Sequence, residues 1–311
     1  RITEQAALKS ARLVGLGDKE GADQAAVDGM HEQFALTPVS GTVVIGEGEI
    51  DEAPMLYIGE HVGQGGEEVD IAVDPVEGTN LVAKGKNGAI AVLAIAPKGC
   101  LLHAPDMYMQ KICVGPRAKG RIDIRASVTE NLKNVADAMG REVSDLTMVI
   151  LDRERHEKII REAREAGARV YLITDGDVVP SVDCGIQGSG IHMVMGSGGA
   201  PEGVLSAVGL KCLGGDMQAR LLPQTEQEIQ RLHTMGIDDP NKVLTLDDLV
   251  KGDDCIFAET AITDCAMLRG VRFFGGEART STLVLRYKAG TVRFIDTVHR
   301  FGEDKPGVRM F

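Results

Sequence analysis

Short apolar runs alternate with amphipathic stretches of helical length along most of the chain. This alternation is typical of α/β proteins, in which helices cover buried strands. We expect helices over residues 3–14, 23–35, 127–139, 153–166 and 201–213. We expect strands over residues 41–45, 69–73, 89–96, 111–114, 147–151, 169–174, 191–195, 255–258, 282–286 and 291–296. The pattern therefore predicts an α/β (α+β) fold.

The alternation becomes regular from about residue 145 onward. We therefore expect two halves, an N-terminal α+β half over residues 1–145 and a C-terminal α/β half over residues 146–311. Small ligands commonly bind between such halves, at the carboxyl ends of strands. Functional side chains are accordingly expected directly after strands.

The charge balance narrows the classes of partner. The chain of 311 residues has 46 acidic and 34 basic residues, a formal net charge of −12. This argues against nucleic acid or an anionic membrane as a partner, because both require a basic surface. A phosphorylated substrate is compatible with the charge, since bound metal ions can reverse the charge of an acidic site.

The sequence favours a cytoplasmic protein. No apolar run approaches the ~20 residues that a membrane-spanning helix needs, and the first residues lack the apolar core of a secretion signal. The six cysteines form no CxxC pair. We interpret them as buried thiols of a reducing compartment.

The segment Asp74-Pro75-Val76-Glu77-Gly78-Thr79 follows the expected strand over residues 69–73. A buried strand that ends in two carboxylates, a turn and a hydroxyl suits divalent metal ions beside a reacting phosphate, because Mg²⁺ and Mn²⁺ take oxygen ligands. The alternative is an ordinary turn, which Asp-Pro and Glu-Gly also favour.

A second acidic segment, Gly46-Glu47-Gly48-Glu49-Ile50-Asp51, follows the expected strand over residues 41–45. Like charges so close repel unless a cation or a proton relay uses them. Taken alone, the segment is better explained as a solvated acidic loop. Its place after a strand makes it a candidate partner of Asp74–Thr79.

Gly198-Gly199-Ala200-Pro201-Glu202-Gly203 is interpreted as a strand–loop–helix junction with Pro201 at the first helical position. Glu202 is then either a metal ligand or a carboxylate that complements the helix dipole, and the local pattern favours the dipole.

Two further segments suit anions or hydroxyl groups. Arg153 and Arg155 lie in the first turn of an expected helix, where the helix dipole disfavours a cation. An anion that binds there would explain both arginines, and the alternative is that their side chains simply snorkel to solvent. Asp175-Gly176-Asp177 ends an expected strand and either binds sugar hydroxyls or caps the next helix.

Gly17–Asp23 is glycine-rich but lacks the Gly-Lys-[Ser/Thr] ending of a nucleotide-binding loop. Asp23 could equally cap a helix. His156 and His192 lack ligand spacing, and we interpret both as structural.

Together these segments resemble the class II fructose-1,6-bisphosphatases, including the cyanobacterial-type members that also hydrolyse sedoheptulose 1,7-bisphosphate. The matching segments are GDKEGAD (17–23), GTVVIGEGEIDEAPMLYIGE (41–60), AVDPVEGTN (72–80), APDMY (104–108), DRERH (152–156), DGD (175–177), GGAPEG (198–203) and GVRFF (270–274). The DP-[acid]-G-T core is shared with the wider lithium-sensitive, metal-dependent sugar phosphatases, whereas GEGEIDEAPMLYIGE together with GGAPEG is highly specific.

The resemblance implies a layered α-β-α-β-α sugar-phosphatase fold that depends on Mg²⁺ or Mn²⁺. The implied metal ligands are Asp23, Glu47, Asp74, Glu77 and Glu202, which reverses the local interpretation of Glu202. The implied substrate contacts are Glu77, Gly78, Thr79, Tyr108, Arg153, Glu154, Arg155, Asp175, Gly176, Asp177 and Gly199. Lys19 is expected to neutralise phosphate charge. Most metal ligands thus lie in the first expected half and most sugar-phosphate contacts in the second.

The implied reaction is hydrolysis of the 1-phosphate of fructose 1,6-bisphosphate, as in gluconeogenesis, with sedoheptulose 1,7-bisphosphate of the Calvin cycle as a second substrate left open by Asn80. Thr79 either attacks phosphorus or orients the attacking water, and Glu49 and Asp51 are the nearest candidates for taking a proton.

The alternatives are an inositol-phosphate or 3′-phosphonucleotide phosphatase of the same superfamily, or a non-catalytic binding protein that kept the fold. We expect a homo-oligomer, a dimer or a tetramer.

Overall fold

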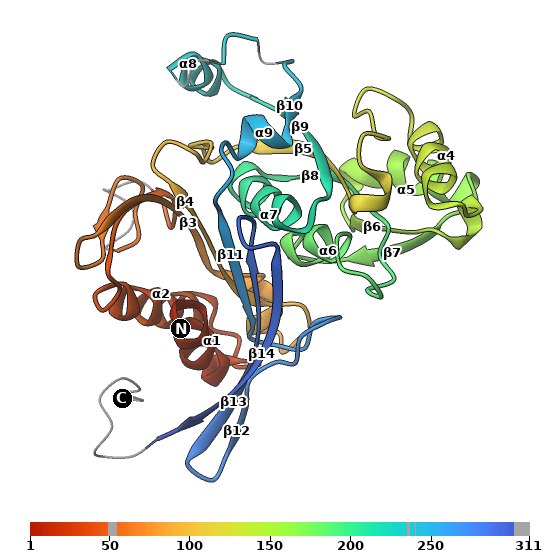
Figure 1. Ribbon diagram of the computed structural model, residues 1–311. Coiled ribbons are helices and arrows are strands. Elements are labelled where there is room, and N and C mark those ends of the chain that lie inside the picture. The colour runs from red at the N-terminus through yellow and green to blue at the C-terminus, as the bar shows by residue number, and fades with distance from the viewer. Residues whose placement is uncertain (49–54, 235–236, 240, 302–311) are drawn as a thin grey trace. The chain divides into compact units, whose positions relative to one another are not determined.

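The computed structural model describes residues 1–48, 55–234, 237–239 and 241–301. The chain forms two compact units (Figure 1), a first unit of residues Arg1–Gly99 and those from Asp254 onward, and a second unit of residues Cys100–Asp253. The boundary expected near residue 145 falls inside the second unit. The reason is strand pairing, because β5 from the expected N-terminal half pairs with β8 and β9 from the expected C-terminal half.

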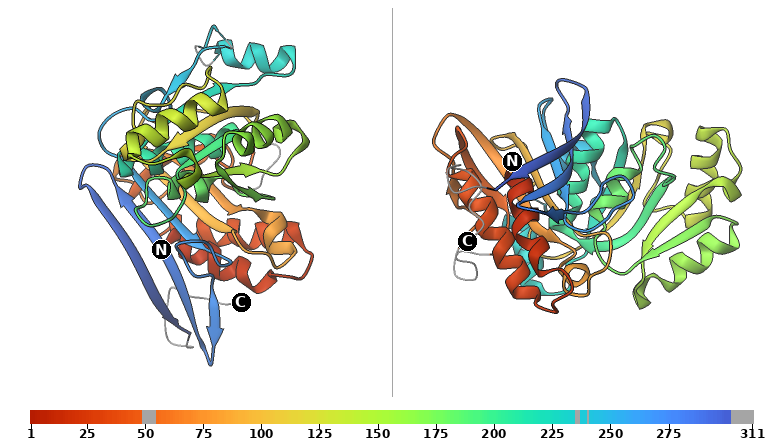
Figure 2. Two further views of the ribbon diagram at one scale, coloured as in Figure 1. Left: turned by 90° about the vertical axis from the view of Figure 1, so that its right-hand side faces the viewer. Right: turned by 90° about the horizontal axis from the view of Figure 1, so that it is seen from below.

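The first unit contains a mixed sheet of eight strands within the described residues, in the order β12-β13-β11-β4-β3-β1-β2, with β14 paired to β13. Its strands are β1 (Val39–Ile45), β2 (His61–Val62), β3 (Glu67–Glu77), β4 (Ile90–Pro97), β11 (Ile256–Ala261), β12 (Arg272–Phe274), β13 (Glu277–Arg286) and β14 (Thr291–Arg300). Among the described strands of this sheet, only β1 and β3 pair in parallel. Strands β13 and β14 form a long hairpin (Figure 2).

Helices α1 (Ile2–Ser10) and α2 (Lys19–Phe34) lie side by side and pack on this sheet, with the short helix η1 (Ala11–Leu13) between them. Small residues let the two helices approach closely. A Cβ atom at Gly29 of α2 would lie 2.9 Å from the Gln5 carbonyl oxygen of α1. Ala6, Ala22 and Phe34 are fully buried in the core beneath them.

The second unit contains a six-stranded sheet in the order β10-β9-β5-β8-β6-β7. Its strands are β5 (Tyr108–Val114), β6 (Thr147–Leu151), β7 (Arg169–Ile173), β8 (Met193–Gly199), β9 (Asp216–Leu221) and β10 (Leu244–Thr245). Its helices are η2 (Pro116–Ala118), α4 (Val128–Met139), η3 (Val143–Asp145), η4 (Glu154–His156), α5 (Glu157–Glu165), α6 (Val178–Asp183), α7 (Ala200–Leu213), α8 (Glu226–Thr234) and α9 (Leu246–Leu249). Strands β6, β7 and β8 are parallel.

Side-chain alternation along β5 explains the layers of this unit. Ile112 and Val114 belong to the apolar cluster under α4 and α5. Lys111 and Cys113 alternate with them and are buried on the opposite face, where α6 and α7 pack (Figure 1). The two faces of one strand therefore serve different purposes, an apolar core and a polar site.

Most expected elements are present with shifted ends, and the side chain of Ser127 caps α4. The Glu130 N–H donates to Ser127 Oγ (3.1 Å). The expectation for Asp23 as a cap is wrong, because α2 begins four residues earlier and Gly21 N–H donates to Asp18 Oδ1 (2.8 Å). None of the described helices has the length and apolarity that a membrane span requires.

Asp183, at the end of α6, is 1% exposed, and its Oδ2 atom has no hydrogen-bond partner among the described residues. Burial raises the pKa of Asp183 to about 7. The folded state therefore holds this proton more tightly than the unfolded state, and stability contributed here falls as pH rises from about 4 towards 7.

We predict that Asp183→Asn removes this loss, because an amide does not ionise. The quantity to compare is the melting temperature of the variant minus that of the unchanged chain. This difference should be larger at pH 8 than at pH 4.5 by at least about 2 °C. Asp137→Asn, which alters an exposed aspartate of α4, is the control. Equal pH profiles for both variants would contradict the prediction.

Candidate functional site

The two carboxylates of Asp74–Thr79 lie on a bulge within β3, not in a turn after it. Asp74 is opposite Val92 and Glu77 is opposite Ile90, so β3 has one extra residue against β4. Pro75 suits this position because it has no N–H to donate to the neighbouring strand. The Val76 N–H donates to Asp74 Oδ1 (3.0 Å). The expected turn is thus replaced by a rigid, paired strand end.

Gly78 and Thr79 form the junction between β3 and the short helix α3 (Thr79–Ala83). Gly78 has φ +93° and caps α3, a conformation that favours glycine. Thr79 is the first residue of the helix and is half-buried, whereas Glu77 is 4% exposed. The Gly78 junction therefore places Thr79 two residues after a buried carboxylate, at the start of a helix.

Asp23 and Glu47 come together although 24 positions separate them in the sequence. Asp23 lies in α2, Glu47 follows β1, and their carboxyl groups hydrogen-bond. Burial, followed by the charge of Asp23, raises the pKa of Glu47 to about 8. Burial also raises the pKa of Asp23. The raised pKa values favour one proton shared by the two carboxyl groups, and a divalent cation could replace that proton.

This carboxyl pair fits a hard divalent metal ion, because both groups supply oxygen donors and neither is paired with a basic side chain among the residues that the structure describes. Within the described ranges no group of three or more His, Cys, Asp or Glu side chains is close enough to hold a metal ion by itself. Glu49 and Asp51 lie outside the described residues. Lys19, the first residue of α2, is exposed.

A second polar cluster lies in the second unit around Lys111 of β5. Lys111 is 1% exposed, and its Nζ donates to Asp177 Oδ1 (2.8 Å) and contacts the Gly199 carbonyl oxygen (3.5 Å). Burial alone would lower the pKa of Lys111, but the charges of Asp177 and Glu202 raise it. Asp177 makes no side-chain cap to α6, so its interpretation as a mere cap is wrong.

Glu202 lies in the first turn of α7, and adjacent glycines leave room for its carboxylate. Strand β8 runs to Gly199 and α7 begins at Ala200, so the expected loop is absent. A Cβ atom at Gly199 would lie 1.9 Å from Glu202 Oε2, and one at Gly198 would lie 2.5 Å from Asp177 Oδ2. Glu202 Oε2 is buried and has no hydrogen-bond partner among the described residues. An oxygen in that condition suits a cation as its missing partner.

Arg155 is fixed by Ser197 and Tyr108. Its Nε donates to Ser197 Oγ (3.0 Å), its Nη2 donates to the Ser197 carbonyl oxygen (2.9 Å), and the guanidinium lies 4.9 Å from the centre of the Tyr108 ring. The half-buried Arg153 donates to the carbonyl oxygen of Asp152 (3.0 Å). Arg155 is thus a pre-positioned cation rather than a snorkelling side chain.

His156 supports this arrangement as a neutral imidazole. Its Nδ1–H donates to the Leu151 carbonyl oxygen (2.8 Å), and its Nε2 accepts from the Ser197 N–H (2.8 Å). Burial lowers the pKa of His156, which keeps it uncharged. Sequence reasoning missed Lys111 and Ser197. A lysine inside an otherwise apolar strand was the available signal for Lys111, and Ser197 had none.

The sequence matches the family model described as bacterial fructose-1,6-bisphosphatase, glpX-encoded, over residues 1–299. It is 50% identical to the D-fructose 1,6-bisphosphatase class 2/sedoheptulose 1,7-bisphosphatase of a Synechococcus species, over 99% of this chain and 96% of that protein. It is 48% identical to the protein of the same name from Crocosphaera subtropica, over 96% of this chain and 94% of that protein. It is 47% identical to the protein of the same name from Trichodesmium erythraeum, over 98% of this chain and 95% of that protein.

We predict that Lys111→Met lowers the free energy of unfolding by about 3–5 kcal/mol, because it leaves the Asp177 and Glu202 carboxylates buried without a cation. Urea denaturation measures the loss. The double variant Lys111→Met/Asp177→Asn should lose less unfolding free energy than the two single variants lose together.

Lys242→Met is the matched control for this prediction. Lys242 forms an exposed ion pair with Asp248 (3.0 Å), so its loss should cost about 1 kcal/mol or less. Equal losses for Lys111→Met and Lys242→Met would show that the buried charge cluster contributes nothing to stability.

Proposed function

The chain belongs to the glpX-encoded family of bacterial fructose-1,6-bisphosphatases, and we propose that it hydrolyses the 1-phosphate of fructose 1,6-bisphosphate to fructose 6-phosphate and phosphate. We propose sedoheptulose 1,7-bisphosphate as its second substrate. The observation that carries this proposal is identity of about half the residues, over nearly the whole chain, to relatives whose names state both activities. The buried carboxyl groups of the first unit and the fixed arginine of the second support it.

We propose that Mg²⁺ or Mn²⁺ ions are held by Asp23, Glu47, Asp74, Glu77 and Glu202, with water or substrate phosphate oxygens completing the ligands of each ion. The shared proton of Asp23 and Glu47 and the unpartnered Glu202 Oε2 support this set. When bound, the ion supplies positive charge to the phosphate and to the leaving oxygen. The residues themselves contribute pre-formed oxygen donors, since the β3 bulge and the Gly199–Glu202 contact fix their positions.

Within the proposed mechanism, Thr79 takes part in the chemical step, either by attacking phosphorus or by orienting the attacking water. Its position directly after Glu77 and the Gly78 cap supports this role. We propose Glu49 and Asp51 as the groups that take the proton, and Lys19 as a cation for the phosphate. Lys19 is exposed at the start of α2, so it is free to reach an incoming anion.

The proposed substrate contacts combine anion-binding and hydroxyl-binding groups. They are Glu77, Gly78, Thr79, Tyr108, Arg153, Glu154, Arg155, Asp175, Gly176, Asp177 and Gly199. The restraint of Arg155 by Ser197 and Tyr108 supports a role in binding phosphate, because a guanidinium that is already ordered loses little entropy when an anion binds. In the second unit, Arg153 and Arg155 follow β6, and Asp175 and Asp177 follow β7.

We propose that the protein is cytoplasmic and forms a homo-oligomer, a dimer or a tetramer. All six cysteines are free thiols, three of them buried and three half-buried, as suits a reducing compartment. Along β14, Val292, Phe294, Ile295 and Val298 are exposed apolar side chains. Such a row is a candidate surface for a second copy of the chain.

Phosphate release from a substrate panel tests the proposed activity. The panel holds fructose 1,6-bisphosphate, sedoheptulose 1,7-bisphosphate, inositol 1-phosphate and 3′-phosphoadenosine phosphate, each with Mg²⁺, Mn²⁺ or EDTA. We expect release from the two sugar bisphosphates with either metal and none with EDTA. Preference for inositol 1-phosphate or the nucleotide would replace the proposed substrate, and binding without release would indicate a non-catalytic protein.

We predict that Thr79→Ala lowers kcat for fructose 1,6-bisphosphate by about a hundredfold or more at saturating metal, because the hydroxyl acts in the chemical step. Thr79→Ser keeps the hydroxyl and should retain turnover within about tenfold. Steady-state kinetics measures both. Turnover of Thr79→Ala close to that of the unchanged chain would rule out a direct role.

A further inference from the structure

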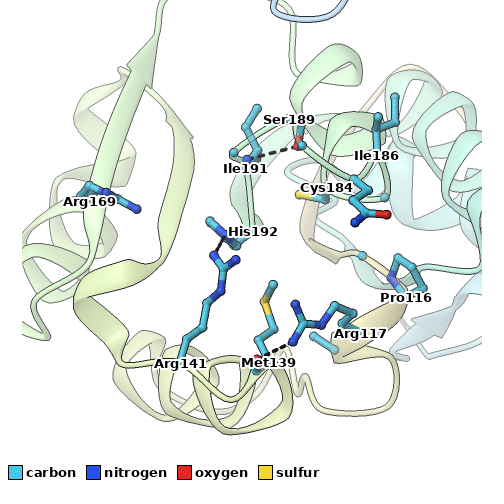
Figure 3. A pocket seen from close by; sticks show the side chains of 16 residues that line it. Pro116, Arg117, Met139, Arg141, Arg169, Cys184, Ile186, Ser189, Ile191 and His192 are labelled. Carbon is cyan, nitrogen blue, oxygen red and sulfur yellow. Dashed lines mark hydrogen bonds between the residues drawn. The ribbon is translucent and has the colours of Figure 1, made fainter.

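The second unit contains a pocket of about 500 Å³ that none of the proposed site residues lines. Figure 3 shows Arg117, Arg141 and Arg169 reaching towards it from three sides, with His192 between them. Arg141 precedes β6, Arg169 begins β7 and His192 precedes β8. The pocket therefore lies at the amino ends of these parallel strands, whereas Arg155 and Asp177 follow their carboxyl ends.

The three guanidinium groups have no carboxylate partners within the part of the chain that the structure describes. Arg117 Nη2 donates to the Met139 carbonyl oxygen (2.5 Å), and Arg169 Nη2 donates to the Asp145 carbonyl oxygen (2.6 Å). Each guanidinium has five N–H donors, so these bonds leave most donors of both groups unused. In a chain of net charge −12, three cations without acidic partners at one pocket are a local exception.

Arg141 and Thr147 both direct an N–H group at the ring of His192. The Thr147 N–H lies 2.9 Å from Nδ1, and Arg141 Nη1 lies 2.8 Å from Nε2. Burial, Arg141, Arg169 and Arg117 lower the pKa of His192, so the imidazole stays neutral. A neutral imidazole has one acceptor nitrogen and one N–H, so it accepts from only one of these two donors and its own N–H faces the other. The cluster therefore has more donors than acceptors.

The other residues that line the pocket indicate what the uncharged part of a ligand would contact. Pro116, Ala118, Ile186 and Ile191 present apolar surface, and a pocket of this volume accommodates a small organic molecule. Gly188, with φ +92°, belongs to the loop that closes one side. The pocket thus combines a cationic part with an apolar part.

We propose that this pocket binds a small phosphate monoester, whose dianionic group contacts Arg117, Arg141 and Arg169 and whose organic part contacts Pro116 and Ile186. Guanidinium groups match phosphate oxygens in geometry as well as in charge. The proposal does not depend on the proposed phosphatase activity, because it concerns the opposite ends of the strands.

Calorimetric titration of the full chain in EDTA tests the proposal. The probes are phenylphosphonate, which carries a phosphate-like dianion that cannot be hydrolysed, inorganic phosphate, and phenol as the uncharged counterpart. We expect saturable binding of phenylphosphonate, weaker binding of inorganic phosphate and none of phenol. Arg141→Gln/Arg169→Gln should weaken phenylphosphonate binding about tenfold or more.

Two control variants locate the binding. Arg121→Gln/Arg125→Gln removes two exposed charges from the same unit and should leave the affinity unchanged within about twofold. Arg153→Gln/Arg155→Gln alters the proposed substrate contacts and should also leave it unchanged. If the pocket variant is not folded by circular dichroism, Arg141→Gln alone provides the test.

Three outcomes would overturn the proposal. They are an unchanged affinity in the pocket variant, loss of binding in Arg153→Gln/Arg155→Gln alone, and no saturable binding of phenylphosphonate up to about 10 mM.

Discussion

Carboxylates that are buried close to one another repel, and compensation of this repulsion governs the polar sites of both units. In the first unit a proton shared by Asp23 and Glu47 compensates their repulsion. In the second unit the buried ammonium of Lys111 compensates Asp177, with which it forms an ion pair. The first solution is exchangeable, because a divalent cation can take the place of the proton. The second is permanent, because the lysine belongs to the sheet. This difference is consistent with metal binding to Asp23 and Glu47 and with a positioning role for Lys111.

Such crowding requires backbone that leaves space for the carboxylates. Gly198 and Gly199 provide it in the second unit, since a side chain at either position would collide with Asp177 or Glu202. Pro75 has a comparable role in the first unit, because it allows β3 to bulge without losing a donor from its ladder. The polar groups are therefore held by regular secondary structure rather than by loops, which favours a precise geometry.

The sequence marked Asp74, Glu77 and Thr79 as candidate site residues but did not predict their geometry. A proline and a glycine next to acidic residues indicate a turn as readily as a bulge, and only the pairing with β4 separates the two. Glu202 was assigned to the helix dipole on local grounds, because a glutamate in a first helical turn looks the same whether or not its oxygen lacks a partner. The burial of Glu202 Oε2, and the absence of a hydrogen-bond donor for it among the described residues, are properties of the folded chain.

The helices and strands themselves were largely predictable, because their apolar periodicity is local. The division into units was not, since it depends on pairings between distant segments. Nothing in the composition near residue 145 shows that β5 belongs with β8, or that β4 pairs with β11. Arg117, Arg141 and Arg169 likewise lie far apart in the sequence, and only the strand order brings them to one pocket.

The pairing of β4 with β11 also has a consequence for synthesis of the chain. Residues Cys100–Asp253, the whole second unit, leave the ribosome between these two strands. The second unit therefore has all its strands while the sheet of the first unit still ends at β4. Until β11 is made, β4 presents an unpaired edge of apolar residues, which is the kind of edge that recruits strands from other chains. In a nascent chain this edge of β4 therefore stays without its partner strand throughout translation of the second unit.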